Sequence, residues 1–139
     1  MATINTYLNF NGNTEEAFNF YKSVFGGEFI AVQRFKGSPG CEGMTVEDQQ
    51  KIMHIALPIG GNILMGTDII DPMPPITFGT GISLSIDAES EQETNRLFDL
   101  LSAGGVVTLP LQKMNWGALF GMATDKFGIQ WMLNYDYDK

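Results

Sequence analysis

The chain contains one histidine, His54, and this residue is the first candidate for acid–base or metal chemistry. An imidazole can bind a metal ion or move a proton near neutral pH. His54 lies in KIMHIALPI, residues 51–59, where alternation places it on one strand face with Ile52 and Ala56. Its neighbours are apolar, which fits a strand buried on both sides. His54 is therefore either a hydrogen-bonded interior residue, a ligand contact or a general base. With no second histidine, a two-histidine scheme within one subunit is excluded.

Other candidates lie on polar strand faces and in one loop. In TINTYLNF, residues 3–10, alternation places Asn5, Tyr7 and Asn9 on a polar face. Asp87 ends the segment GISLSID, and we expect it to cap the helix that follows. Trp116 precedes a glycine in a loop and could form an aromatic wall or close one end of the core. The residues expected to contact a ligand are Tyr7, Asn9, His54, Met65, Trp116 and Met132.

The segments that position these residues occur twice along the chain. NTEEAFNFYKSVFGG and SEQETNRLFDLLSAGG each have helical periodicity and end in a glycine pair. Asn13 with Glu16, and Ser90 with Glu93, predict a capping box at each helix start. A strand precedes each helix and three strands follow it, and residues 36–50 are expected to be a loop. LNFN matches LSID, and GNILM matches GIQWM.

This repetition predicts an α+β fold of two βαβββ repeats that form a cup-shaped mixed sheet. We expect one domain over residues 1–139, with repeat one at about 2–68, a connector at 69–77 and repeat two at about 78–137. Each helix would bury one sheet face, and the polar faces left over would line the cup.

The composition narrows the class of partner. A formal net charge of −8 makes nucleic acid an unexpected partner and mildly favours a cationic ligand. The single cysteine, Cys41, suits a reducing compartment, and we expect a cytoplasmic protein. The chain has no apolar run long enough to cross a membrane and no signal-peptide pattern at its start, so no membrane partner is expected.

Three segments resemble the glyoxalase/bleomycin-resistance superfamily, also called vicinal oxygen chelate, and within it the PhnB-like branch. They are YLNFNGNTEEAFNFYKSVFGGE, MHIALPIGGNILMGTD and WGALFGMATDKFGIQWMLN. The resemblance implies a cup-shaped sheet and a homodimer. It does not imply one chemistry, because the superfamily includes isomerases, dioxygenases, thiol transferases and non-catalytic drug-sequestering proteins.

Metal-dependent members of this superfamily hold the ion with His or Glu side chains from two strands of each repeat. The corresponding positions here carry Asn5, Gly81, Met132, and Met65 or its neighbour Leu64. None of these is a usual ligand for a hard or borderline cation, so no metal site and no cofactor are expected. Relatives of this branch are sometimes labelled ubiquinone-pathway methyltransferases. This chain, however, lacks the glycine-rich strand-to-helix turn that would support a nucleotide-type cofactor.

The sequence therefore favours a protein that binds a small organic molecule in its cup without metal. One alternative is a metal-free lyase, isomerase or transferase that uses His54 as acid or base. Another alternative is a metal-dependent enzyme of the glyoxalase or dioxygenase kind with unusual ligands.

Overall fold

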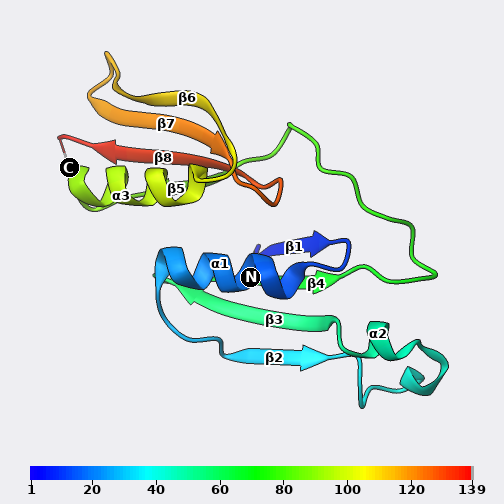
Figure 1. Cartoon of the computed structure of the whole chain (residues 1–139). Helices are drawn as coiled ribbons and strands as arrows, with labels where there is room; N and C mark the ends of the chain where they lie inside the picture. The colour runs from blue at the N-terminus through cyan, green and yellow to red at the C-terminus, as the bar shows by residue number, and fades with distance from the viewer. Residues whose placement is uncertain (139) are drawn as a thin grey trace. The chain divides into compact units, whose positions relative to one another are not determined.

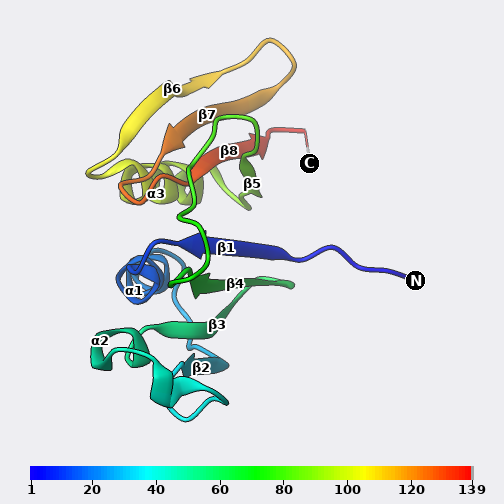
Figure 2. The same cartoon turned by 90° about the vertical axis from the view of Figure 1, so that its right-hand side faces the viewer.

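The computed structural model describes residues 1–138 and divides the chain into two compact units, Met1–Thr77 and a second that begins at Phe78. Each unit contains one four-stranded sheet and one long helix, in the order strand, helix and three strands (Figures 1 and 2). The α+β class and the two βαβββ repeats are thereby confirmed, with the strands divided between two separate sheets.

Unit 1 contains β1 (Thr6–Phe10), α1 (Thr14–Phe25), β2 (Ala31–Arg34), β3 (Ile52–Ile59) and β4 (Asn62–Asp68). The strand order is β1-β4-β3-β2, with β1 parallel to β4 and the other pairs antiparallel. A 3-10 turn, η1 (Cys41–Gly43), and a short helix, α2 (Val46–Gln49), lie between β2 and β3. The expectation of a loop throughout residues 36–50 was therefore wrong. Thr45 caps α2 by accepting a hydrogen bond from the Asp48 amide, a pattern readable in the sequence.

Unit 2 contains β5 (Leu84–Asp87), α3 (Glu91–Ser102), β6 (Val106–Lys113), β7 (Ala118–Thr124) and β8 (Gln130–Asp136). Its strand order is β5-β8-β7-β6, again with one parallel pair between the first and last strands of the repeat. The two sheets thus have the same connectivity.

Each long helix packs a phenylalanine against a sheet glycine. A Cβ placed on Gly66 of β4 would lie 2.6 Å from the ring of Phe18 on α1. In unit 2, a Cβ on Gly121 of β7 would lie 2.9 Å from the ring of Phe98 on α3. Only glycine allows this close approach, so these residues fix which sheet face each helix covers.

The start of α1 is held by the carboxylate of Asp68, which lies at the end of β4. Its Oδ1 accepts from the Thr14 amide at 3.0 Å and from the Thr14 hydroxyl at 2.6 Å, and its Oδ2 accepts from the Ile52 amide at 2.8 Å. Asp68 is 3% exposed, and these three bonds satisfy the buried charge. Asn13 makes no side-chain cap, so the capping box expected with Glu16 was wrong. The cap expected at Ser90 is confirmed, because its hydroxyl accepts from the Glu93 amide.

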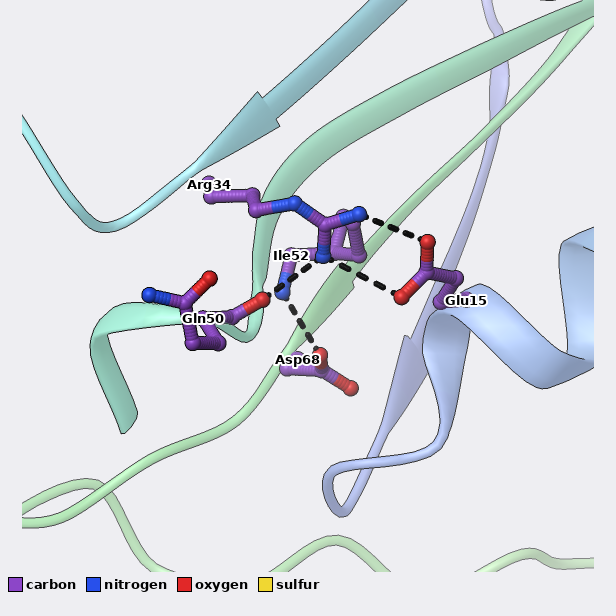
Figure 3. Close-up of polar contacts among 5 residues, drawn as sticks. All are labelled: Glu15, Arg34, Gln50, Ile52 and Asp68. Carbon is purple, nitrogen blue, oxygen red and sulfur yellow. Dashed lines mark hydrogen bonds and ion pairs between the residues drawn. The ribbon is translucent and has the colours of Figure 1, made fainter. Parts of the chain in front are cut away.

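A second polar contact joins α1 to β2 beside Asp68 (Figure 3). Arg34 donates through both terminal nitrogens to Glu15, at 2.6 and 3.1 Å, and also to the Gln50 carbonyl at 2.7 Å. The hydrogen bonds from Arg34 lower the pKa of the Glu15 carboxyl. The contribution of this pair to stability is therefore present at neutral pH and is lost as the pH falls through that lowered pKa. Both side chains are partly exposed, so the contribution is small.

Removing the Asp68 carboxylate should strongly destabilise the protein. We expect Asp68→Ala to lower the free energy of unfolding by about 3 kcal/mol, because it leaves buried amides of α1 and β3 without acceptors. Urea unfolding measures the loss, with exposed Asp87→Ala as the matched control. A loss below about 1 kcal/mol would contradict the role assigned to Asp68.

Adding one methyl group beneath α1 should also destabilise the protein. We expect Gly66→Ala to cost about 2 kcal/mol, because its Cβ would overlap the Phe18 ring, and Phe18→Leu in the same chain should recover part of that cost. Gly61→Ala is the control, since its Cβ would meet nothing within 4 Å. Thermal unfolding of the three variants tests this, and equal melting temperatures for Gly66→Ala and Gly61→Ala would refute it.

Candidate functional site

The sheet of unit 1 has one face that α1 does not cover, which we call the first open face. The register aligns Tyr7 with Met65, Met65 with Ala56 and Ala56 with Ala31, so these side chains share one face. Gly66, which contacts Phe18 of α1, belongs to the other face. The first open face carries Tyr7, Asn9, Ala31, Gln33, His54, Ala56, Met65 and Thr67.

His54 lies on this first open face and is partly buried. Its Nδ1 is 2.9 Å from the hydroxyl of Tyr7, and the two ring centroids are 5.7 Å apart. The strand β4 separates β1 from β3, so the Tyr7 side chain reaches across it. His54 therefore faces away from α1 and is hydrogen-bonded. Ile52 was expected on the same face as His54, but it is fully buried. The pairing of β2 with β3 is irregular here, because Gln33 lies opposite His54 and Arg34 lies opposite Ile52. This irregularity interrupts the alternation expected for β3.

The Tyr7–His54 hydrogen bond determines which imidazole nitrogen can contact a ligand. Burial raises the pKa of the Tyr7 phenol, so its hydroxyl stays protonated at neutral pH. Because the phenol is the stronger acid of the two neutral groups, we assign it as the donor to Nδ1. The neutral imidazole then carries its proton on Nε2, where it can donate a hydrogen bond.

The sheet of unit 2 has a corresponding second open face. One row across it aligns Ser85 with Met132 and Met132 with Met122. The next row aligns Asp87 with Asn134 and Asn134 with Phe120. Met132 thus occupies in unit 2 the position that Met65 occupies in unit 1, since each lies beside the first strand of its repeat.

Trp116 lies in the turn between β6 and β7 and is 63% exposed. Its ring contacts that of Phe120, with centroids 6.2 Å apart. Trp131 is buried, as expected for the core, and its indole nitrogen donates to Asp125 Oδ2 at 2.8 Å.

Asp87 does not cap α3, so that expectation was wrong. Ser90 provides the cap, and Asp87 instead accepts a hydrogen bond from the Asn134 side chain at 3.2 Å. The same Asn134 nitrogen also donates to Asp136 at 3.2 Å. One amide therefore holds two carboxylates on or beside the second open face.

The structure gives the place of each position that corresponds to a metal ligand in the family. Asn5 precedes β1, and the register makes Ser83, rather than Gly81, its counterpart before β5. Met65 lies on the first open face, whereas Leu64 is buried on the helix side. Within residues 1–138, no three His, Cys, Asp or Glu side chains lie close enough together to hold a metal ion.

The sequence did not single out several residues of these faces. Phe120 and Asn134 were read only as parts of strands, although alternation from Met132 and Trp131 places Asn134 on the second open face. Gln33 and Thr67 could likewise have been assigned to the first open face from the alternation of β2 and β4. In the part of the chain that the structure describes, no helix is both long and apolar enough to span a membrane.

Comparison with known proteins identifies similar chains along nearly the whole sequence. A family model described as 3-demethylubiquinone-9 3-methyltransferase matches residues 2–134. Protein YjdN of Escherichia coli is 31% identical, over 94% of this chain and 93% of its own length. The crystal structure of protein PA1353 from Pseudomonas aeruginosa is 39% identical, covers 98% of each chain and has a TM-score of 0.85.

A PhnB protein from Bacillus cereus is 29% identical, with 96% of this chain and 99% of that chain covered and a TM-score of 0.79. In fold alone, the likeness extends to a glyoxalase-related enzyme from Fulvimarina pelagi. That protein is 16% identical and has a TM-score of 0.66, and the match covers 98% of this chain and 89% of that protein. The expected likeness to the PhnB-like branch is thereby confirmed, and the likeness to a glyoxalase-related enzyme is one of fold.

The single histidine allows a direct test of the Tyr7 hydrogen bond. Nitrogen-15 NMR at a pH where the ring is neutral should show one imidazole with its proton on Nε2. Tyr7→Phe removes the donor to Nδ1, so the spectrum should move toward a mixture of tautomers. Asn9→Ala, on the same face, should leave the spectrum unchanged. An Nδ1-protonated ring in the wild type would contradict the assignment.

Proposed function

The chain belongs to the PhnB-like family whose model is described as 3-demethylubiquinone-9 3-methyltransferase, and from this membership we propose that it binds a small organic molecule without a metal ion. The expected contact residues are taken unit by unit: Tyr7, Asn9, His54 and Met65 in unit 1, and Trp116 and Met132 in unit 2. These side chains lie on the two open faces or, for Trp116, in contact with one. A binding site of this kind combines apolar contact area with a few oriented polar groups.

The observation that carries this proposal is the Tyr7–His54 hydrogen bond on the first open face. A phenol and an imidazole that orient each other provide a fixed donor beside the flexible thioether of Met65. A ligand with a hydrogen-bond acceptor and an apolar body fits this combination. The donor set also supports a metal-free site, because a divalent cation needs three or four convergent nitrogen, oxygen or thiolate ligands.

The description of the family model raises the question of a methyl-donor cofactor of the nucleotide type. Such a cofactor uses a glycine-rich turn and the free amides of a helix start. In unit 1 the turn before α1 contains one glycine, Gly12, and the Thr14 amide is already bound by Asp68. In unit 2 the turn before α3 has no glycine, and Ser90 binds the Glu93 amide. These turns do not fit the cofactor, and we derive no methyl transfer from them.

A metal-free enzyme that uses His54 is the second candidate, and the same hydrogen bond bears on it. With Nδ1 bound to Tyr7, Nε2 is the ring nitrogen left to exchange a proton with a substrate, so His54 would act as acid or base through Nε2. A glutamine at this position would keep a nitrogen donor and lose the ability of the imidazole to exchange a proton. Retained ligand binding together with lost turnover in His54→Gln would therefore favour the enzyme.

Ligand binding should be detectable in the metal-free protein. After dialysis against a chelator, a thermal-shift screen of small organic molecules should identify compounds that raise the melting temperature saturably. For such a compound we expect Tyr7→Phe and His54→Ala each to weaken binding about 5-fold, since each removes one oriented hydrogen bond.

Val46→Ala, at an exposed position on α2, is the control and should bind as the wild type does. The proposal fails if no compound of a broad panel stabilises the metal-free protein. It also fails if Tyr7→Phe and His54→Ala both bind the compound as tightly as the wild type does.

A further inference from the structure

Trp116 is the most exposed aromatic side chain on or next to the second open face, and it lies in a hydrogen-bonded turn. The Gly117 amide donates to the Met114 carbonyl at 3.1 Å, and the Met114 amide donates to the Ala118 carbonyl at 2.7 Å. Gly117 has φ of +88°, a conformation that other residues rarely adopt. The turn therefore leaves the Trp116 ring exposed and in contact with Phe120, and together the two rings present aromatic surface beside the second open face.

Three carboxylates lie at positions near Trp116 and Phe120 in the sheet register or the adjoining turn. Phe120 lies directly opposite Asn134, whose side chain holds Asp87 and Asp136. Next to Trp116, a Cβ on Gly117 would lie 3.4 Å from a carboxylate oxygen of Asp138. Aromatic faces and carboxylates both attract positive charge.

The cations of unit 2 within residues 78–138 lie at other surfaces. Lys113 stacks over the ring of Tyr137 at 5.4 Å and pairs in register with Leu119, on the helix side of the sheet. Lys126 lies over the ring of Phe127, beyond the opposite end of β7 from Trp116. Arg96 is on α3, which covers the other face. The second open face thus combines aromatic rings with acceptor groups and carries no cation of its own from these residues.

We propose that the second open face binds an organic cation, a quaternary or aromatic ammonium group, against Trp116 and Phe120 and beside Asp87, Asp136 and Asp138. This inference rests on the proposed function and names the chemical class of ligand that this face takes. The charge of the ligand lies over the aromatic faces, and the carboxylates neutralise it without a covalent step. The net charge of −8 attracts such a ligand from solution.

An NMR titration with choline and its uncharged isostere 3,3-dimethylbutan-1-ol tests the inference on the intact protein. The chain has two tryptophans, so the indole N–H signals report Trp116 and, as an internal control, the buried Trp131. We expect choline to shift the Trp116 signal saturably and to bind at least about 5-fold more tightly than the alcohol, because only choline carries charge. The Trp131 signal should stay in place.

Two variants of equal charge locate the site. Asp87→Asn should weaken choline binding about 3-fold and leave the affinity for the alcohol unchanged, since only the attraction between charges is reduced. Asp99→Asn, on α3, is the matched control and should bind choline as the wild type does. Equal affinity for choline and the alcohol would overturn the inference while leaving ligand binding at this face intact. If neither compound shifts the Trp116 signal, the inference fails, and so does the assignment of a ligand to the second open face. Ligand binding at the first open face is then tested separately by the Tyr7→Phe and His54→Ala variants.

Discussion

The buried carboxylate of Asp68 is the constraint on which unit 1 depends. Its bonds to the Thr14 amide and hydroxyl and to the Ile52 amide tie the end of β4 to the start of α1 and the start of β3. A charge that is 3% exposed tolerates no missing partner, so this junction fixes α1 over one face of the sheet. The opposite face is left for other chemistry. The register of the sheet places Tyr7 and His54 on that opposite face.

Unit 2 reaches the same architecture with different polar contacts. Its helix is capped locally by Ser90, and its buried carboxylate, Asp125, stabilises the turn between β7 and β8. Asp125 accepts from the amides of Phe127 and Ile129 and from the indole of Trp131. What the units share is the contact of a phenylalanine with a sheet glycine. Shape complementarity under the helix is therefore common to both repeats, whereas the polar anchors differ.

The local parts of the structure could be predicted from the sequence, and the long-range polar contacts could not. Alternation located the strands and the polar faces, because side-chain direction depends only on neighbouring residues. The capping role of Asn13 was assigned wrongly: the Thr14 amide at the start of α1 donates to Asp68, which is 54 residues from Thr14. The partner of His54 was equally hidden, since Tyr7 is 47 residues away and reaches it across an intervening strand. Such contacts require the register of the sheet, which periodicity alone does not supply.

The two open faces differ chemically although the sheets beneath them have the same connectivity. The first open face presents a donor, the imidazole of His54 oriented by the phenol of Tyr7, whereas the second carries Phe120 with the carboxylates held by Asn134. Met65 and Met132 occupy the same place in each repeat and adapt to either environment. Substitutions on these faces leave the anchors under the helices untouched, so the ligand preference of each face can change while its repeat keeps its fold.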